Sequence, residues 1–290
     1  MFEIKGKTST AVCYANTIEE EAIEQIRRMC DYDFTEGSKI CIMPDVHAGK
    51  GCTIGTTMTV HGKAVPNIVG VDIGCGMYTV NIGKADIDFE KVDEAAHYIP
   101  SGMNVWQGRQ EHFNLQELAC YRSLNNTKYL ERSLGTLGGG NHFIEIDQAA
   151  DGTKYLVIHT GSRNLGKQVA EIYQHLAVEL HSGKEEYFKK RDEIIATYKA
   201  EGRRKEIHAA LKELRWERRD SLIPDDLCCL YGTYFDDYLH DVEICQQFAR
   251  RNREKIAEIL LNHIGREAWE AFHTIHNYID TENMILRKGA

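Results

Sequence analysis

The 290-residue sequence has few of the features that would place it in a specialised class of protein. It has only 4 prolines and no repetitive tract, which argues against long disordered segments. No stretch approaches the roughly 20 consecutive apolar residues that a membrane-spanning helix needs. Residues 1–10 (MFEIKGKTST) also lack the basic and then apolar pattern of a secretory signal. We therefore expect a cytoplasmic protein that does not associate with a membrane.

A disulfide framework and an excess of basic residues are also missing. The nine cysteines are scattered and odd in number, so we expect most of them to be reduced thiols in a core or at a site. The chain has 35 Lys and Arg against 44 Asp and Glu, a formal net charge of −9. A protein that coats nucleic acid would need the opposite balance. A local basic groove or bound cations can nevertheless hold phosphate on an acidic protein.

Strands and helices are predicted to alternate irregularly along the chain. Apolar residues recur at helical spacing in three stretches, 17–31 (with Thr17 as N-cap), 167–181 and 236–264. The polar stretch 89–130 is also expected to be helical. Short apolar runs between glycines predict strands at 40–43, 56–60, 67–71, 77–80, at the end of 134–146, and at 155–163.

These patterns predict an α+β fold, with mixed strands and helices around a Gly-rich cleft that holds two metal ions. We expect one catalytic domain over residues 1–290. The stretch 184–220 holds 12 Lys and Arg and 9 Asp and Glu, and is expected to be a charged helical insertion. A solvated helical surface is the simpler interpretation of this insertion, and an RNA-binding arm is the alternative.

Two glycine-rich segments combine metal-capable residues. In MPDVHAGKG (43–51), Asp45 and His47 are two residues apart, so on a strand both would point to one face. The alternative is a turn in which Asp45 accepts backbone hydrogen bonds. In VGVDIGCGM (69–77), the Cys75 thiolate could bridge two divalent ions, with Asp72 completing a shell. The alternative there is a buried structural cysteine and a capping aspartate.

Three later segments each contain a histidine beside other polar residues. The glycines at 138–140 free N–H groups for an anion cradle, and Asn141 and His142 follow them. His159 ends an apolar strand, and Arg163, four residues on, could clamp a phosphate. His276 is followed by Asn277.

Another histidine, His273, is more simply interpreted as a residue on the face of a helix than as a metal ligand. We therefore leave it out of the candidate site.

Five of these residues together match a mixed nitrogen, oxygen and sulfur site for two divalent ions. They lie in loops or at strand ends and comprise Asp72, Cys75, His142, His159 and His276. Because they span about 200 residues, no local zinc-finger spacing is involved. A bridging thiolate and one carboxylate would leave such a centre positively charged and able to attract phosphate.

Seven segments resemble, in order, the motif series of the RtcB family of RNA-splicing ligases. They are MPDVHAGKGCTIG (43–55), VGVDIGCGM (69–77), LGTLGGGNHFIEI (134–146), HTGSRNLG (159–166), GTYFDDYL (232–239), HNY (276–278) and RKGA (287–290). The resemblance runs from about residue 40 to the end, apart from 184–220.

The resemblance implies a GTP- and Mn²⁺-dependent ligase that joins RNA 3′-phosphate or 2′,3′-cyclic phosphate ends to 5′-hydroxyl ends in tRNA splicing or RNA repair. It implies that Asp72, Cys75 and His142 hold one manganese ion. Cys75 would bridge to a second ion, held by His159 and His276.

The resemblance also implies residues around the substrates. GTP would lie against Asn141, His142, Phe143, Ile144, Glu145, His276, Asn277 and Lys288. Arg163 and Lys288 would meet a phosphate of GTP or RNA, and Asp45 and His47 would have supporting roles.

The family attaches GMP to a histidine in a later motif of the type SHGAGR, and no histidine follows His276 here. The resemblance therefore predicts a chain truncated at its C-terminal side, without the nucleophilic histidine and unable to guanylylate itself. Two alternatives stay open. A dinuclear metallohydrolase would turn over phosphoesters without GTP, and an inactive metal- or RNA-binding remnant would bind Mn²⁺ without turnover.

Overall fold

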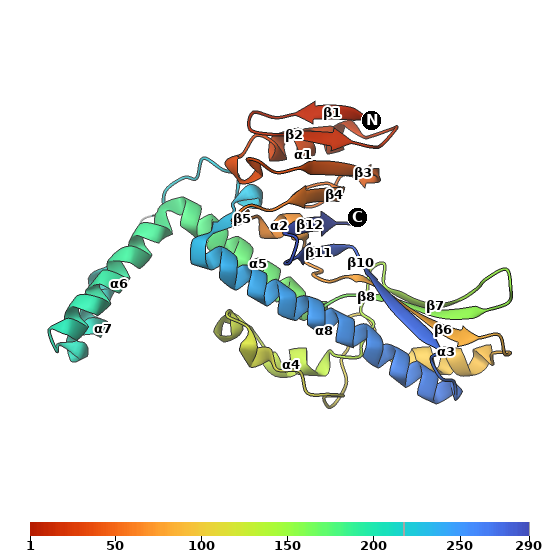
Figure 1. Cartoon of the computed structure of the whole chain (residues 1–290). Coiled ribbons are helices and arrows are strands. Elements are labelled where there is room, and N and C mark those ends of the chain that lie inside the picture. Colours follow the sequence, from red (N-terminus) through yellow and green to blue (C-terminus); the bar gives the residue numbers. More distant parts are fainter. Residues whose placement is uncertain (217, 290) are drawn as a thin grey trace.

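The structure, a computed structural model, describes residues 1–216 and 218–289 and consists of two main β-sheets joined by helices (Figure 1). This mixture confirms the predicted α+β class. Across these residues, no helix is both long enough and apolar enough to cross a bilayer. All nine cysteines are free thiols.

The larger sheet has six strands in the order β1-β2-β3-β4-β12-β11 and lies at the top of Figure 1. Only β2 and β3 are parallel neighbours in it. The C-terminal strands therefore complete a sheet that the N-terminal residues begin. Its strands are β1 Phe2–Lys5, β2 Thr10–Cys13, β3 Ile40–His47, β4 Ile54–Thr59, β11 Asn277–Asp280 and β12 Ile285–Lys288.

The smaller main sheet has four antiparallel strands in the order β10-β6-β8-β7. They are β6 Gly76–Gly83, β7 Phe143–Gln148, β8 Lys154–Thr160 and β10 Glu270–Ile275. A two-stranded ladder joins β5 Lys63–Ala64 to β9 Leu230–Tyr231.

One long helix connects the cores beneath the two sheets. The helix α8 has 33 residues, which corresponds to roughly 50 Å at 1.5 Å per residue. Val242 and Phe248 in its first part belong to the core of the six-stranded sheet. Ile256 and Leu260 belong to the core of the four-stranded sheet. The helices are α1 Glu20–Met29, α2 Pro66–Val69, α3 Phe89–Tyr98, α4 Thr127–Arg132, α5 Arg163–Glu179, α6 Glu185–Ala200, α7 Ile207–Glu213 and α8 Gly232–Ile264.

The helices α6 and α7 project away from both sheets (Figure 1). The chain reaches them from α5 through a turn at Leu180–Lys184, where Gly183 has a φ of 91°. Neither helix has a buried side chain. The stretch predicted as a charged helical insertion, 184–220, is helical over α6 and α7, whereas residues 214–216 and 218–220 are not helical and Glu217 lies outside the described residues.

Some predictions of local structure are wrong. The stretch 89–130 is not a continuous helix, because α3 and α4 are separated by irregular turns and two short 3₁₀ helices at Leu115–Glu117 and Tyr121–Ser123. Pro100 and Gly102, which has a φ of 61°, interrupt any helix there. Residues 67–71 are not a strand, because Pro66 opens the helix α2 at its first position. Thr17 is not the N-cap of α1, since Glu19 holds that place.

Candidate metal centre

Five metal-capable side chains meet where the chain crosses from one main sheet to the other. Asp72 and Cys75 lie in the loop between α2 and β6, and His142 directly precedes β7. His159 is in β8 near its end, and His276 joins β10 of the smaller sheet to β11 of the larger one. Four of these positions are therefore at or beside strand ends, and Asp72 lies in the turn that precedes Cys75.

The strand register brings these ends together. Gly76 pairs with Thr160 on one side and with Ile275 on the other. On the next strand, Phe143 pairs with His159. Since Cys75, His276 and His142 each adjoin one of these paired residues, the antiparallel ladder aligns them with His159.

The side-chain distances define two sets of ligand atoms that share one sulfur. The Cys75 Sγ lies 3.6 Å from the His142 Nε2 and 3.4 Å from the His159 Nε2. The His159 Nε2 is 3.4 Å from the His276 Nε2, and the His142 Nε2 is 2.9 Å from Asp72 Oδ2. Within each set, Asp72–Cys75–His142 and Cys75–His159–His276, all ligand atoms lie within 4.8 Å of one another.

These spacings fit metal coordination. Ligands at metal–nitrogen and metal–sulfur distances of about 2.1 and 2.3 Å around one ion are roughly 3.0 to 3.6 Å apart. The set also offers the nitrogen, oxygen and sulfur donors that suit borderline divalent ions. The five residues present therefore fit the dinuclear site that the motif series implies, and bound metal remains a proposal.

Backbone carbonyls orient two of the imidazoles toward the centre. The Nδ1 of His142 lies 3.1 Å from the carbonyl oxygen of Leu137, and the Nδ1 of His159 lies 3.0 Å from that of Asn141. Each carbonyl accepts a hydrogen bond only if Nδ1 carries the proton. The Nε2 lone pairs are then left for ligation, an arrangement typical of metal-bound histidines.

In the absence of a cation, burial favours the neutral form of His159 and His276 and the protonated form of the Cys75 thiol. It lowers the pKa of His276 to about 4, with a further contribution from His159. It also lowers the pKa of His159. Burial raises the pKa of Cys75 far above its usual value, and the nearby Asp72 carboxylate adds to this. Cation binding must therefore displace the thiol proton.

Asp72 stays ionised despite its surroundings. Burial by itself would raise its pKa, but without a cation a protonated His142 offers Asp72 a hydrogen bond and a positive charge, which outweigh burial and hold the pKa below its usual value. Gly161 makes room for this carboxylate, since a Cβ there would overlap Asp72 Oδ1.

Two buried polar residues of α8 support the site and were missed in the sequence. Arg253 is fully buried and donates from Nη1 to the carbonyl oxygens of Gly74 (2.7 Å) and Thr160 (2.8 Å), next to Cys75 and His159. Asn252, also fully buried, bonds to both the glycine-rich passage and the loop after β8. The sequence could have indicated both residues, because they are polar side chains on the otherwise apolar face of an amphipathic helix.

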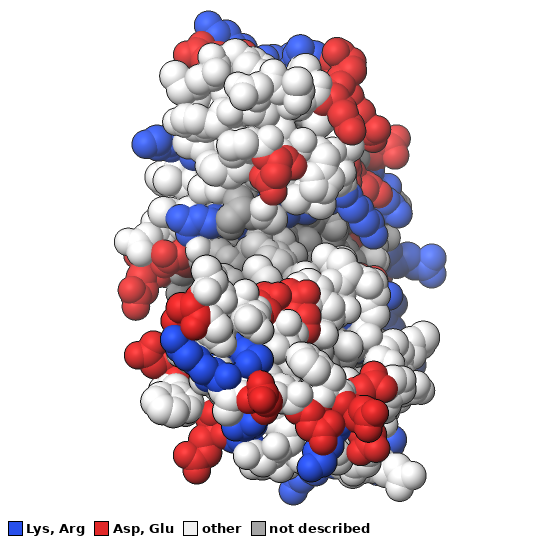
Figure 2. Space-filling model, turned by 90° about the vertical axis from the view of Figure 1, so that its right-hand side faces the viewer, with Lys and Arg blue, Asp and Glu red and all other residues white. Residues whose placement is uncertain are grey.

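A cavity of about 440 Å³, here called the β12 cavity, opens on the six-stranded sheet side of the centre. Figure 2 shows the face on the right-hand side of Figure 1, which is hollowed across its middle and has Lys and Arg intermixed with Asp and Glu instead of gathered into one basic surface. Several expected ligand-binding residues line this cavity, namely His47, Asp72, Asn141, His276, Asn277 and Lys288.

Lys288 has a different set of partners from the one expected. Its side chain is buried, and Nζ donates to the carbonyl oxygens of Lys50 (2.5 Å), Cys52 (3.1 Å) and Asn67 (3.3 Å). These bonds tie β12 to the loops around β3 and β4. A contact between this ammonium and a phosphate stays a prediction. Ala290, at the end of the RKGA motif, lies outside the described residues.

The other predicted residues divide between the centre and its surroundings. The ring of Phe143 lies 5.1 Å from that of His159. Ile144 instead packs against the core of the four-stranded sheet, and Glu145 is exposed. Asp45 is exposed on β3, and its carbonyl lies 2.9 Å from the Nδ1 of His47. His273 lies on the strand β10, so its expected place on a helix is wrong.

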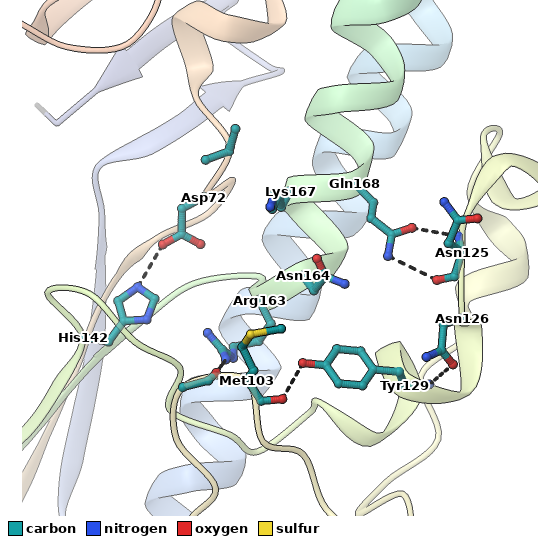
Figure 3. A pocket seen from close by; sticks show the side chains of 12 residues that line it. Asp72, Met103, Asn125, Asn126, Tyr129, His142, Arg163, Asn164, Lys167 and Gln168 are labelled. Atoms are coloured by element: carbon teal, nitrogen blue, oxygen red, sulfur yellow. Dashed lines mark hydrogen bonds and ion pairs between the residues drawn. The ribbon is translucent and has the colours of Figure 1, made fainter.

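Arg163 opens the helix α5 instead of lying in a turn before it. Its guanidinium donates to Thr136 Oγ1 (3.1 Å) and to the carbonyl of Gly102 (2.9 Å). It lies against Gly138, where any Cβ would overlap it. Arg163 lines a second cavity with Asp72 and His142 (Figure 3).

Comparison with known proteins agrees with the motif series. A family model described as tRNA-splicing ligase RtcB matches residues 25–128 and 110–290. The RNA-splicing ligase RtcB of Escherichia coli K12 is 30% identical over 295 aligned residues, covering 87% of this chain and 64% of that protein. The chain thus spans slightly less than two thirds of this relative's length.

More distant relatives align over shorter segments. The tRNA-splicing ligase RtcB of Aeropyrum pernix is 26% identical over 191 residues, covering 46% of this chain and 39% of that protein. The RNA-splicing ligase RtcB homolog 1 of Entamoeba dispar is 27% identical over 196 residues, covering 47% and 36%. Since the two ranges matched by the family model together extend from residue 25 to residue 290, the chain belongs to the RtcB family.

Proposed function

We propose that this chain forms the metal centre of a GTP- and Mn²⁺-dependent RNA ligase, which joins a 3′-phosphate or 2′,3′-cyclic phosphate end to a 5′-hydroxyl end. The names of its relatives support RNA ligation, and the end chemistry and cofactors follow from the motif series. The observation that carries the proposal is the pair of ligand sets sharing the Cys75 sulfur.

Two divalent ions bound there would neutralise phosphate charge and orient an attacking oxygen. The protein's own residues prepare the site for this. The carbonyls of Leu137 and Asn141 hold His142 and His159 with Nε2 facing inward. Arg253 fixes the backbone on either side of the centre through Gly74 and Thr160.

We assign the nucleotide of GTP to the β12 cavity. Asn141, His276 and Asn277, which the motif series associates with guanylate, all line this cavity next to Asp72. Its volume of about 440 Å³ falls within the range of small-molecule sites. A nucleotide there would present its phosphates to Cys75 and to the two histidines beside it, His142 and His159.

The proposal is tested by metal binding and by RNA-end recognition. Equilibrium dialysis should give two Mn²⁺ ions per chain, with magnetic coupling visible in the electron paramagnetic resonance spectrum. Cys75→Ala should lose both features. Cys41→Ala, which removes a free thiol on β3 away from the two ligand sets, should keep them.

Fluorescence anisotropy should then show Mn²⁺-dependent binding of a six-nucleotide RNA, tighter with a 3′-phosphate than with a 3′-hydroxyl. Steady release of phosphate from this RNA without GTP would identify a metallohydrolase and overturn the ligase assignment. One ion or none per wild-type chain would overturn the shared-sulfur site.

A further inference from the structure

The second cavity beside the centre has no role in the assignment above. It measures about 580 Å³ and is here called the α5 cavity. It shares Val71 and Asp72 with the β12 cavity, so the two cavities reach the centre from different directions. A reaction that brings two substrates to one metal pair needs such a second approach.

The lining of the α5 cavity suits a phosphate group. Arg163 and Lys167 bring two positive charges from the first turns of α5, and Asp72, a predicted metal ligand, is the only carboxylate among the lining residues that the structure describes. This contrasts with the net charge of −9 of the whole chain. The Lys167 ammonium pairs with Glu171 at 3.8 Å on the exposed surface, and such pairs are weak.

The start of α5 adds to this positive potential. The helix has 17 residues and its N-cap Ser162 makes no side-chain cap, so the positive end of the helix dipole lies at the residues that line the cavity. Arg163 itself has a φ of 61°, a left-handed conformation that is strained in residues other than glycine. Strain of this kind is concentrated at functional sites.

The opposite wall offers contacts for a ribose and a base. Asn125 and Asn164 line the cavity, and no hydrogen bond of their side-chain amides is found among residues 1–216 and 218–289. Met103 is 86% exposed at the rim, where its carbonyl accepts a hydrogen bond of 2.7 Å from the Tyr129 hydroxyl. An exposed apolar side chain beside free amides suits a nucleobase more than inorganic phosphate.

A pair of hydrogen bonds between Gln168 and Asn125 separates the α5 cavity from the next hollow along α5. Gln168 accepts from the backbone N–H of Asn125 (2.8 Å) and donates to its carbonyl (3.2 Å), as Figure 3 shows. The hollow on the far side of these hydrogen bonds is lined by Glu171 and Glu179. Those carboxylates disfavour a continuing phosphate backbone, so the α5 cavity suits one terminal nucleotide.

We propose that the α5 cavity binds the terminal nucleotide of the RNA strand that ends in phosphate. In this arrangement Arg163 and Lys167 contact phosphate, and Met103 and the two free amides contact the base and ribose. This inference rests on the proposed function and adds the place of its RNA substrate. It leaves GTP on the other side of Asp72, in the β12 cavity.

Lys167→Met tests the charge contact, with Lys128→Met on α4 as control, because Lys128 is exposed and does not line the cavity. The probe is a fluorescent six-nucleotide RNA with a 3′-phosphate, titrated with Mn²⁺ present at 50 to 200 mM salt, conditions chosen to expose the ionic contribution. We expect Lys167→Met to weaken binding about tenfold at the lower salt and to reduce the salt slope by about one. Lys128→Met should match the wild type.

Met103→Ala tests the base contact. It should weaken RNA binding several-fold and leave the salt slope unchanged, because it removes no charge. Both variants should still bind two Mn²⁺ ions and should bind GTP as the wild type does.

Unchanged RNA binding in both variants, alongside Mn²⁺-dependent binding by the wild type, would overturn this inference and leave the proposed function standing. Weakened GTP binding in Lys167→Met would also overturn it, by assigning the cavity to the nucleotide. Absence of Mn²⁺-dependent RNA binding in the wild type would overturn both proposals.

Discussion

Replacing Arg253 with methionine should destabilise the chain strongly, because this guanidinium joins the two backbone segments that bear Cys75 and His159. The side chain is fully buried, and burial lowers its pKa to about 10. Methionine fills similar space without donors. The carbonyls of Gly74 and Thr160 would then lose bonds of 2.7 and 2.8 Å.

The magnitude follows from these two carbonyls. Each buried acceptor left without a partner costs about 1–3 kcal/mol. Removing a buried charge offsets part of this loss, and the Nη2 of Arg253 already lacks a hydrogen-bond partner among the described residues. We expect a net loss of roughly 2–4 kcal/mol in the free energy of unfolding.

The assay is guanidinium unfolding in the presence of a chelator, so that metal binding does not add to the measured stability. The control is Arg250→Met on the same helix. The side chain of Arg250 is largely exposed, and its Nε lies 3.0 Å from a carboxylate oxygen of Glu254. That variant should change stability by less than about 0.5 kcal/mol. Equal midpoints for Arg253→Met and Arg250→Met would show that the two bonds from Arg253 to backbone carbonyls contribute little to stability.

Three further predictions concern the surroundings of the centre. Asn252→Asp should cost roughly 3–5 kcal/mol in thermal unfolding, since it turns a carboxylate oxygen toward the carbonyls of Thr136 and Gly161; an unchanged melting temperature would contradict this. Burial lowers the pKa of His273 to about 4, below its value of about 6.5 in the unfolded chain. Between these two pH values the unfolded chain binds more protons than the folded one. The free energy of unfolding should therefore fall as the pH drops from about 6.5 to 4. His273→Phe, which keeps a ring beside Tyr78, should show a shallower loss over that window in denaturant midpoints, and an identical slope would count against it. Gly138→Ala should displace the Arg163 guanidinium, because Gly138 has a φ of 90° and no room for a Cβ. The variant should bind RNA more weakly and lose about 1–3 kcal/mol in the free energy of unfolding. Unchanged RNA affinity and stability would show that the loop adapts to the methyl group.

The local elements that could be predicted were those with a long, regular pattern. The stripe that includes Val242, Cys245 and Ala249 repeats over many turns, and α8 was predicted within a few residues of its start. Short apolar runs gave no such certainty, because four or five residues fit a strand or one helical turn equally well. The run at 67–71 therefore predicts a strand, whereas Pro66 favours the first turn of a helix there.

The candidate ligands could be chosen from the sequence because their residue types are rare beside glycines. Asp72, Cys75 and His142 each stand in a glycine-rich motif, where backbone passes close to other groups. The supporting contacts could not be chosen in this way. The bonds of Arg253 to Gly74 and Thr160 join positions up to 179 residues apart, and no local pattern encodes such a pairing.

Motif chemistry alone singles out the candidate metal ligands and the family that the motifs resemble. Only the folded chain shows that these side chains share one centre, that Lys288 is bound to carbonyl oxygens, and that two cavities meet at Asp72. The difference lies in the range of the interactions. Side-chain chemistry and helical periodicity are local properties, whereas a centre formed by the ladder β10-β6-β8-β7 depends on hydrogen bonds between distant strands.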